Sequence, residues 1–429
     1  MSKPTRGLRV GNYRITPLGL VTLAILLLLV IAAIVLFVIK PFDLTGTIFG
    51  PRPTPTPEVT ATPEPSPTPT PKPTPEPEPR SATIRSLGEI AMQQNLLRSA
   101  VSENSFDFAP MFSEISDVIG NADYTVADVE GTLGDTVDYS GNGSKLITPS
   151  SLIGVLKDCG VDMLMLANDH ALDGGFKEQQ ATVQNCISMG MDYVGAAASA
   201  EEKATPNIKE INGINVAFLA YTESLNGNEK KADKAATQYG VNLITASNAV
   251  KDISSARENG ADVIVCYVSW GKMLQRTPTA NQRKIAQYLS QAGVDVIVGY
   301  NPHVVQPAAW METTNTSGEV HRTLCLGATG NFLSDQRDLY CDSGIIFEFT
   351  IQETGPATGE FTITAPTYIP TYVWRNTDGD KYVYRTLPVG KWLEEQPEGM
   401  AYTDVTRMRQ VWAEIQNIMG SDVATIAAE

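Results

Sequence analysis

Three short phrases of one kind constrain the fold of this chain more than any other feature. They are "CGVDMLML", "NGADVIVC" and "AGVDVIVG", which begin at residues 159, 259 and 292. In each phrase a helix-like segment ends at a glycine, an aspartate follows, and a buried apolar strand begins. We interpret the similarity as shared architecture rather than as a sequence repeat. Helices that lead again and again into buried strands favour an α/β domain with mixed sheets.

The alternation of strand-like and helix-like segments runs from about residue 81 to about residue 344. Predicted strands are 82–91, 124–130, 162–168, 192–197, 214–222, 262–270, 295–301 and 322–332, and predicted helices are 149–160, 175–190, 245–260 and 279–293. Beyond this point the pattern predicts antiparallel strands and one closing helix, at 344–351, 359–370, 371–375, 381–389 and 403–419. Because no turn-rich segment separates this β-rich part, we expect one domain over residues 81–429.

The first residues predict a membrane anchor. Residues 1–16 carry four basic side chains and no acid, and residues 17–39 are uncharged and apolar. Such a run can cross a bilayer as a helix, and its basic flank predicts a cytoplasmic N-terminus and an extracellular main domain. The alternative is a cleaved signal peptide, which we disfavour because the apolar run is too long and no A-x-A-like cleavage site follows it.

A linker over residues 40–80 is predicted to follow the anchor. Proline recurs at nearly every second position from residue 51 to residue 80. Such spacing forbids helices and sheet ladders and favours polyproline II, which at about 3.1 Å per residue could reach roughly 90 Å. We expect a disordered tether that lifts the domain through a cell wall. The sequence leaves open whether its Thr-Pro repeats are glycosylated.

The charge balance limits the partners of the exported part. The formal charge of the chain is −16, and residues 1–40 contribute five positive charges, so the remainder carries about −21. This balance argues against nucleic acid and anionic lipid as partners of the domain. A local metal or cationic site could still bind an anionic ligand.

The cysteine content does not indicate a disulfide framework. The chain has five cysteines and no C-x-x-C pair. We interpret them as buried thiols, while one disulfide between Cys325 and Cys341 stays open for an exported domain.

Polar side chains gather where the predicted strands end, which is where ligands bind in α/β sheets. One such residue alone usually caps the following helix. The whole set includes two of the three histidines, and carboxylates, amides and imidazoles together suit a hard divalent cation or acid–base chemistry. The residues are Glu89, Asp128, Glu130, Asn168, Asp169, His170, Asp173, Ser269, Trp270, Asn301, His303 and Asn331.

The motifs "GEI", "VEGTL", "ANDHALDGG", "SWGK", "GYNPHVVQP" and "GNFLSDQ", in this order, resemble the CapA family of poly-γ-glutamate capsule biosynthesis proteins. The resemblance covers about residues 82–350. It implies a metallophosphoesterase-type fold of the calcineurin-like kind, in which mixed β-sheets form a sandwich flanked by helices. It also implies a role in a capsule or envelope polymer, and the predicted anchor and tether suit such a protein in a Gram-positive bacterium.

Several residues depart from the family pattern, and two of these departures remove imidazole ligands. The departures are Glu89 for aspartate, Asp128 and Asp169 for asparagine, Ser269 and Asn301 for histidine, and Met273 for an acid. Zinc prefers nitrogen and sulfur ligands, so these changes favour Mn²⁺, Mg²⁺ or Ca²⁺ over zinc. We expect one weakly held divalent metal or none, rather than the two-metal centre of a phosphoesterase.

The resemblance also assigns roles to individual residues. It implies metal ligands at Glu89, Glu130, Asp169, Asn301 and His303. His170 would act as acid–base group, with Asp173 orienting it or capping the next helix. The alternative is that His170 only closes a hydrogen-bond network between loops. Contacts to an anionic substrate are predicted for Asp128, Asn168, Ser269, Trp270, Lys272 and Asn331.

Two functions from different classes follow. The replaced ligands, the tether and the anchor favour a non-catalytic capsule subunit that exports, retains or scaffolds a polymer. The alternative is an active metal-dependent hydrolase or phosphoesterase acting on an envelope polymer or its precursor. A third hypothesis, an extracellular adhesin, is less favoured, because it does not explain the polar residues at the strand ends. The expected partners are the anionic polymer and, by resemblance, capsule-synthesis membrane subunits.

Overall fold

The computed structural model describes residues 8–10, 13–15, 78–315, 318–395, 400–420 and 423–425. The predicted anchor at 17–39 and most of the predicted linker lie outside these residues. The chain divides into two compact units, residues 1–73 and 74–429. In the first unit, β1 (Leu8–Val10) pairs antiparallel with β2 (Tyr13–Ile15). No helix within the described ranges is long and apolar enough to cross a membrane.

The second unit contains two large sheets. The first has the strand order β11-β10-β6-β3-β18-β19-β20, with β21 beside β19. Its first four strands are parallel, and β18, β19 and β20 continue it antiparallel. The strands are β3 (Ser81–Ile90), β6 (Tyr124–Val129), β10 (Met163–Met165), β11 (Asp192–Val194), β18 (Ser343–Glu353), β19 (Phe361–Asp378), β20 (Lys381–Pro388) and β21 (Ala424–Thr425).

The second sheet has six strands in the order β12-β13-β14-β15-β17-β16. Its four central strands are parallel, and the two edge strands are antiparallel to their neighbours. The strands are β12 (Ile208–Ile211), β13 (Ile214–Thr222), β14 (Val263–Ser269), β15 (Val296–Tyr300), β16 (Val305–Thr314) and β17 (Val320–Thr329).

Helices and short elements complete the unit. The helices are α2 (Gln94–Ala100), α3 (Ser116–Gly120), α4 (Ser151–Asp158), α5 (Phe176–Met189), α6 (Ala200–Lys203), α7 (Ala246–Glu258), α8 (Ala280–Gln291), α9 (Val389–Glu394) and α10 (Tyr402–Met419). A small sheet has the order β7-β9-β8 and is made of β7 (Thr132–Leu133), β8 (Ser140–Asn142) and β9 (Lys145–Thr148). The remaining elements are β4 (Val101–Ser102), β5 (Ser105–Phe106), η1 (Ala109–Met111), η2 (Asn228–Lys230) and η3 (Ala236–Gly240).

Residue alternation along the strands sets the order of the layers. In β14, Val263, Val265 and Tyr267 face the core that the two sheets share, whereas Ile264 and Cys266 face the core under α7 and α8. Strands buried on both faces read as continuous apolar runs, which is why the phrase "DVIVCYV" carries no polar face. The outer face of the first sheet packs in the same way under α2, α4 and α5. The layers are therefore helix, sheet, sheet and helix.

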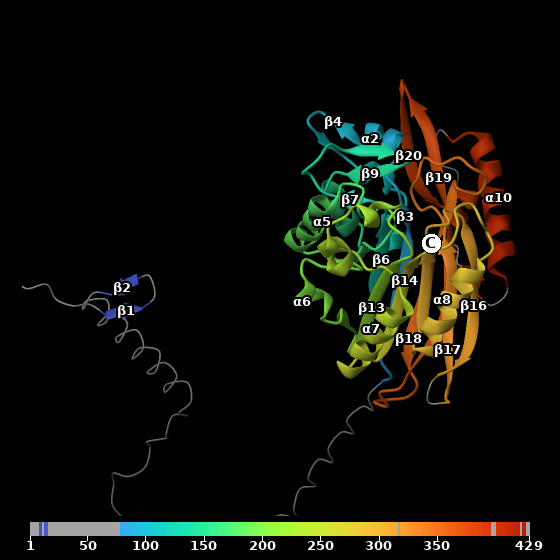
Figure 1. Cartoon of the computed structure of the whole chain (residues 1–429). Helices are drawn as coiled ribbons and strands as arrows, with labels where there is room; N and C mark the ends of the chain where they lie inside the picture. Colours follow the sequence, from blue (N-terminus) through green and yellow to red (C-terminus); the bar gives the residue numbers. More distant parts are fainter. Residues whose placement is uncertain are drawn as a thin grey trace, which may run out of the picture. The chain divides into compact units, whose positions relative to one another are not determined.

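The C-terminal helix α10 closes the shared core at one side. Its buried residues, among them Met408, Val411 and Ile415, all belong to the core between the two sheets. Figure 1 shows α10, coloured red, running along β16 and β19. The β-rich part that follows residue 344 is thus built into the same body as the parallel strands.

Local sequence signals explain where the helices begin and end. Thr279 and Gln282 form a capping box at the start of α8, and Thr245 caps α7. The helix α5 ends at Gly190, whose left-handed conformation satisfies the last carbonyl groups of the helix.

The α/β fold class and the sandwich of two mixed sheets are confirmed, and the predicted helices agree with α4, α5, α7 and α8 within three residues at each end. Several details differ from the prediction. The two strands predicted at 359–370 and 371–375 form one strand, β19 (Phe361–Asp378), and the edge strands β12 and β16 and the helix α2 were not predicted. All five cysteines are free, so the disulfide left open between Cys325 and Cys341 is not formed.

Candidate functional site

The carboxyl ends of the parallel strands of both sheets meet at one site. The first sheet contributes β3, β6 and β10, and the second contributes β14, β15 and β17. The approach of β3 to its neighbours depends on Gly88, because a Cβ atom there would lie 2.8 Å from Asp128 Cβ and 2.9 Å from Tyr300 Cε1. The backbone of Gly88 also has φ +147°, which side chains rarely adopt.

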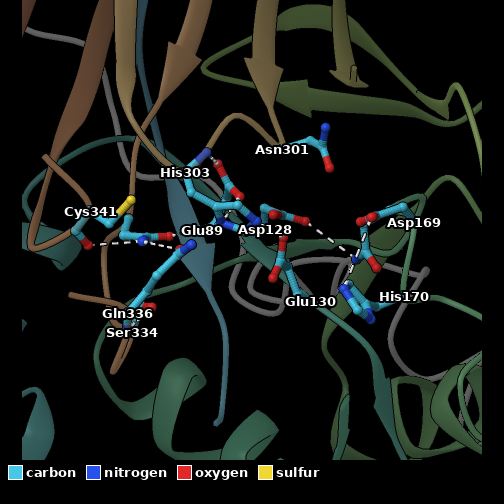
Figure 2. Close-up of polar contacts among 12 residues, drawn as sticks. Glu89, Asp128, Glu130, Asp169, His170, Asn301, His303, Ser334, Gln336 and Cys341 are labelled. Carbon is cyan, nitrogen blue, oxygen red and sulfur yellow. Dashed lines mark hydrogen bonds and ion pairs between the residues drawn. The ribbon is translucent and has the colours of Figure 1, made fainter. Parts of the chain in front are cut away.

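Glu89, Glu130 and His303 form the centre of the site. One ligand atom from each lies within 4.8 Å of the others, and all three residues are buried. The two glutamates come from the ends of β3 and β6 in the first sheet, and the histidine follows β15 in the second. Figure 2 shows the three side chains turned toward one another. The structure thus brings together three of the five predicted metal ligands.

The orientation of the His303 ring is fixed by two acceptors. Its Nδ1 atom lies 2.7 Å from Glu89 Oε2 and 3.2 Å from Asn331 Oδ1. The amide nitrogen of Asn331 donates to the carbonyl of Cys341 at 2.9 Å, so its oxygen must face the ring. A nitrogen between two acceptors carries the proton, which leaves Nε2 turned toward Glu130 Oε1 at 3.9 Å. Asn331 therefore orients His303, and the substrate contact predicted for it stays a prediction.

His170 and Asp173 form a second, adjoining group. The Nδ1 atom of His170 lies 2.5 Å from Asp173 Oδ2, and the same oxygen accepts from the backbone N–H of Leu146 at 2.7 Å. The other oxygen of Asp173 accepts from the side chain of Asn228 at 3.3 Å. Asp173 therefore orients the imidazole, which was one of its two predicted roles, and also joins it to the β8–β9 hairpin.

Asp169 and Asp128 flank the central group. Asp169 Oδ2 lies 4.0 Å from His170 Nε2, and its Oδ1 atom is buried without a hydrogen-bond partner. Asp128 Oδ1 accepts a long hydrogen bond of 3.4 Å from Asn168, and its Oδ2 atom is also buried and unpartnered. Asn168 further donates to the carbonyl of Val129 and accepts from Gly131, so it ties the ends of β6 and β10 together.

The electrostatics of the site reflect four carboxylates in a buried space. Burial, with added repulsion from Glu130 and Glu89, raises the pKa of Asp128 well above its usual range. Burial likewise raises the pKa of Glu130 to about 8, against the opposing attraction of His303. For His170, burial lowers the pKa, but the Asp173 hydrogen bond and the negative charge of Glu130 outweigh it and raise the pKa to about 9.

The balance at His303 is of the same kind. Burial lowers the pKa of His303, and the charges of Glu89 and Glu130 raise it well above its usual range. Without a cation, the site therefore retains protons that a metal ion would displace.

A pocket of about 530 Å³ opens over this group. The carboxylates of Glu130, Asp169 and Asp335 and the two histidines contribute to its lining. None of the described residues that line it is a lysine or an arginine. The complete lining consists of Gln93, Glu130, Gly143, Ser144, Leu146, Asp169, His170, Asn226, Met273, His303, Asp335 and Gln336.

The residues that end strands of the second sheet contribute less to the pocket. Ser269 is buried at the end of β14, and the Trp270 indole donates to the carbonyl of Gly327 at 2.8 Å. Asn301 donates to the carbonyl of Trp270 at 3.1 Å and is drawn apart from Glu89 and His303 in Figure 2. Lys272 is exposed and does not belong to the pocket lining. The roles predicted for these four residues stay predictions.

The residues present fit a hard divalent cation. Glu89 and Glu130 offer oxygen ligands and His303 offers Nε2, while the unpartnered oxygens of Asp128 and Asp169 lie beside them. A buried carboxylate oxygen without a partner costs free energy that a cation can recover. The donor set contains one imidazole and no thiolate, so it favours an oxygen-preferring metal over zinc.

Sequence reasoning missed the hairpin and loop residues of the pocket. Gly143, Ser144 and Leu146 come from the β8–β9 hairpin, Asn226 from the loop after β13, and Gln336 from the loop after β17. The hairpin residues follow no strand of the parallel sheets, and Asn226 and Gln336 lie in the loops beyond the ends of β13 (Ile214–Thr222) and β17 (Val320–Thr329) rather than at the strand ends, so the strand-end argument did not find them. The turn-forming phrase "GNGSK" before β9 was the available signal.

The fold and the site together define an α/β protein with an acidic, metal-type centre at its strand ends. The family model described as "Bacterial capsule synthesis protein PGA_cap" matches residues 83–336, which is more than half of the chain and includes the whole centre. The chain therefore belongs to this family of bacterial capsule synthesis proteins, as the motifs predicted.

Two curated relatives agree with this assignment. The chain is 28% identical over 257 residues to the PGA biosynthesis protein CapA of Bacillus subtilis, covering 59% of this chain and 64% of the relative. It is 24% identical over 280 residues to the capsule biosynthesis protein CapA of Bacillus anthracis, covering 64% and 65%. The matched region thus spans slightly less than two thirds of either relative.

Solved structures resemble the chain more distantly. A 5′-nucleotidase precursor from Thermus thermophilus has a TM-score of 0.41 at 13% identity and is matched over 78% of this chain and 58% of its own. The calcineurin-like phosphoesterase YfkN from Bacillus subtilis has the same TM-score and identity, over 78% and 98%.

Proposed function

We propose that this protein is a membrane-anchored, extracellular component of capsule or envelope polymer biosynthesis that binds an anionic polymer or its precursor through one divalent cation. The curated relatives are named for poly-γ-glutamate (PGA) and capsule biosynthesis, which supports a poly-γ-glutamate-type polymer. The single observation that carries the proposal is the convergence of Glu89, Glu130 and His303 beneath a pocket with an acidic lining.

The charge of the pocket explains why a cation is needed. Three carboxylates line it, and its described lining contains no lysine or arginine. An anionic chain would be repelled from such a surface unless a divalent ion neutralised part of its charge and bridged the carboxylates of the protein to those of the polymer. Glu89, Glu130 and Nε2 of His303 would hold this ion, which would then offer open positions to polymer carboxylates.

We further propose that the site is reduced to one metal. Asp128 and Asp169 keep oxygen atoms near the centre, but the second sheet supplies Ser269 and Asn301 where the family resemblance implies histidines. The Asn301 side chain bonds a backbone carbonyl instead of facing the centre. A second ion would lack the nitrogen ligands that a phosphoesterase centre uses to activate water.

The proposed function is tested on the full-length chain, purified in detergent, chelated and then supplied with Mn²⁺, Mg²⁺, Ca²⁺ or Zn²⁺. We expect metal-dependent binding of short γ-linked glutamyl oligomers, measured by calorimetry, and loss of that binding in EDTA. Equal binding with and without metal, or no binding at all, contradicts the proposal.

A second candidate is a metal-dependent hydrolase of an envelope polymer or precursor. It is favoured by the 2.5 Å contact between His170 and Asp173, because an imidazole oriented by a carboxylate is suited to general acid–base catalysis. On this hypothesis His170→Ala lowers turnover of a phosphoester or γ-glutamyl substrate by at least about 100-fold. The control is His321→Ala, since His321 bonds the carbonyl of Val294 and is absent from the pocket lining.

The fold of both variants is checked by thermal unfolding. Turnover by the wild-type chain that is unaffected by His170→Ala removes His170 from the catalytic role. Absence of turnover in the wild-type chain leaves the binding function as the proposal.

A further inference from the structure

Gln336 contributes an uncharged side chain to the wall of the acidic pocket, and it ends the motif "GNFLSDQ". Its neighbour Asp335 also lines the pocket, but the oxygens of that carboxylate already accept from three other side chains. Gln336 is half-buried, and its backbone N–H donates to the hydroxyl of Ser334 at 3.0 Å. The side chain therefore starts from a fixed point of the loop after β17.

A chain of hydrogen bonds determines which end of the Gln336 amide faces the pocket. Asn331 turns its oxygen toward Nδ1 of His303 at 3.2 Å, and its nitrogen donates to the carbonyl of Cys341 at 2.9 Å. The same nitrogen also donates to Oε1 of Gln336 at 3.3 Å. Because this nitrogen is a donor, the Gln336 atom beside it is the oxygen, and the –NH₂ group lies at the other side of the amide.

The –NH₂ group of Gln336 is left without a protein acceptor. Within the described ranges no residue accepts a hydrogen bond from Nε2, and the protein does not enclose this atom. Gln93, the other glutamine of the lining, uses both ends of its amide, with the hydroxyl of Ser334 and the N–H of Asp335. Gln336 thus offers free N–H donors to the pocket from a fixed direction.

We infer that Gln336 is a specificity-determining residue that donates a hydrogen bond to a carboxylate oxygen of the bound anion. This inference rests on the proposed function, and it adds a contact between the protein and the anion itself. The lining carries three carboxylates, which attract the proposed cation but repel the anion. An amide donates without adding charge, so it can bind a ligand oxygen and leave the acidic group that holds the cation unchanged.

The same hydrogen bonds connect this contact with the centre of the site. Asn331 lies between Gln336 and His303, and Figure 2 shows Gln336 and Cys341 on the same side of His303. If the Gln336 amide is removed, Asn331 keeps its bond to the carbonyl of Cys341, which still turns its oxygen toward the ring. A substitution at Gln336 should therefore weaken anion binding without an equal loss of metal affinity.

The experiment measures the binding of Mn²⁺, and then of γ-linked tetraglutamate, to the full-length chain by isothermal titration calorimetry. Gln336→Met removes the donor at nearly constant volume, and Gln336→Glu keeps an acceptor for Asn331 but replaces the donor with a charge. The matched control is Gln275→Glu, because Gln275 is exposed two residues from Met273 but does not line the pocket. Thermal unfolding shows that each variant is folded.

We expect Gln336→Met to bind the oligomer at least about tenfold more weakly, as for one lost hydrogen bond to a charged group, and to change Mn²⁺ affinity by less than about threefold. Gln336→Glu should lose more oligomer affinity and bind Mn²⁺ at least as tightly as the wild-type chain, because the new carboxylate repels the anion and attracts the cation. Gln275→Glu should change neither affinity by more than about twofold, because its charge is screened by solvent.

Undiminished oligomer binding by Gln336→Met overturns this inference and leaves the proposed function intact. A loss of Mn²⁺ affinity that accounts for the whole loss of oligomer binding has the same consequence, since Gln336 would then act only through the centre. Equal weakening by Gln336→Glu and Gln275→Glu also overturns it, because the added charge alone would explain the effect. Absence of oligomer binding by the wild-type chain overturns both this inference and the proposed function.

Discussion

The two sheets contribute unequally to one site. From the strand ends of the first sheet come Glu89, Asp128, Glu130, Asp169 and His170, and these are charged or unpartnered groups. From the second sheet His303 joins the central group and the loop after β17 adds Asp335 to the pocket lining, while Ser269, Trp270 and Asn301 are buried or bonded to backbone carbonyls. The two sheets thus supply different kinds of side chain to one site, mostly charged groups from the first and mostly neutral, hydrogen-bonded groups from the second. We propose that this imbalance leaves room for one cation.

The largest expected effect comes from adding a methyl group at Gly88, where the two sheets pack closely. In Gly88→Ala the new methyl group would meet Asp128 and Tyr300 below 3 Å, and the backbone at φ +147° disfavours alanine. We expect the free energy of unfolding to fall by about 2–4 kcal/mol and metal binding to be lost. Denaturant unfolding and metal titration of the full-length chain measure both effects.

The control for this substitution is Gly143→Ala in the hairpin of the pocket, where a Cβ atom meets nothing within 4 Å. It should leave both quantities unchanged. If Gly143→Ala lowered the free energy of unfolding and metal binding as much as Gly88→Ala, the loss could not be attributed to the close packing at Gly88.

Removing one charge on the first sheet should weaken the proposed cation site strongly. We expect Glu130→Gln to lower divalent metal affinity by about 100-fold, because one carboxylate of a three-residue group is lost without a change in volume. The comparison variant is Asp335→Asn, since Asp335 lines the same pocket but already accepts from Arg375 and Tyr384. Equal affinity in Glu130→Gln and the wild-type chain would rule out this ligand set.

The pH dependence of the metal-free chain tests the charge balance of the first sheet. The pKa of His170 is raised from 6.5 to about 9, so the stability it contributes is complete below about pH 6.5 and is lost as the pH rises to about 9. The pKa of Glu130 is raised from 4.5 to about 8. Between these two pH values the native state binds a proton that the unfolded state has lost, so the free energy of unfolding again falls as the pH rises.

Both groups therefore act in the same direction. We expect the free energy of unfolding in EDTA to fall by about 1–3 kcal/mol between pH 6.5 and pH 9. A saturating divalent cation should remove most of this fall, because it displaces the same protons. Stability that is constant or rises over this range in EDTA would contradict the assigned charges.

The smallest expected effects distinguish two asparagines of the second sheet. Asn331 orients the ring of His303, so Asn331→Ala should lower metal affinity by about tenfold. Asn301 bonds the carbonyl of Trp270, so Asn301→Ala should change the affinity by less than about threefold. A larger loss of metal affinity from Asn301→Ala would mean that Asn301 is a metal ligand, and would contradict the proposal that the first sheet supplies most of the ligands.

Much of this fold could be predicted from the sequence, because the local turn and strand signals agree with the tertiary packing. The turns at Gly160, Gly260 and Gly293 introduce β10, β14 and β15, and each glycine has a positive φ angle. Strands such as β14 are buried on both faces, so their apolar runs were unambiguous. The edge strand β16 mixes exposed and buried positions without a continuous apolar run, and it was therefore missed.

The candidate site was readable in part for a related reason. Parallel strands bring their carboxyl ends together, so Glu89, Glu130 and His303 could be grouped from their places along the chain. The direction of a side chain cannot be obtained in this way. Asn331 and Asn301 occupy similar places after neighbouring strands, yet Asn331 orients the ring of His303 and Asn301 bonds a backbone carbonyl. The pocket walls from the β8–β9 hairpin depend on packing between distant segments.

Metal stoichiometry tests whether the site holds one cation, bound chiefly by residues of the first sheet. The full-length chain is stripped with EDTA, incubated with Mn²⁺, desalted and analysed by mass spectrometry for metal and protein, beside Glu130→Gln. We expect about one Mn²⁺ per wild-type chain and none above background in the variant. Two ions per chain would show that the second sheet completes a two-metal centre, and none would show that the acidic group binds no metal.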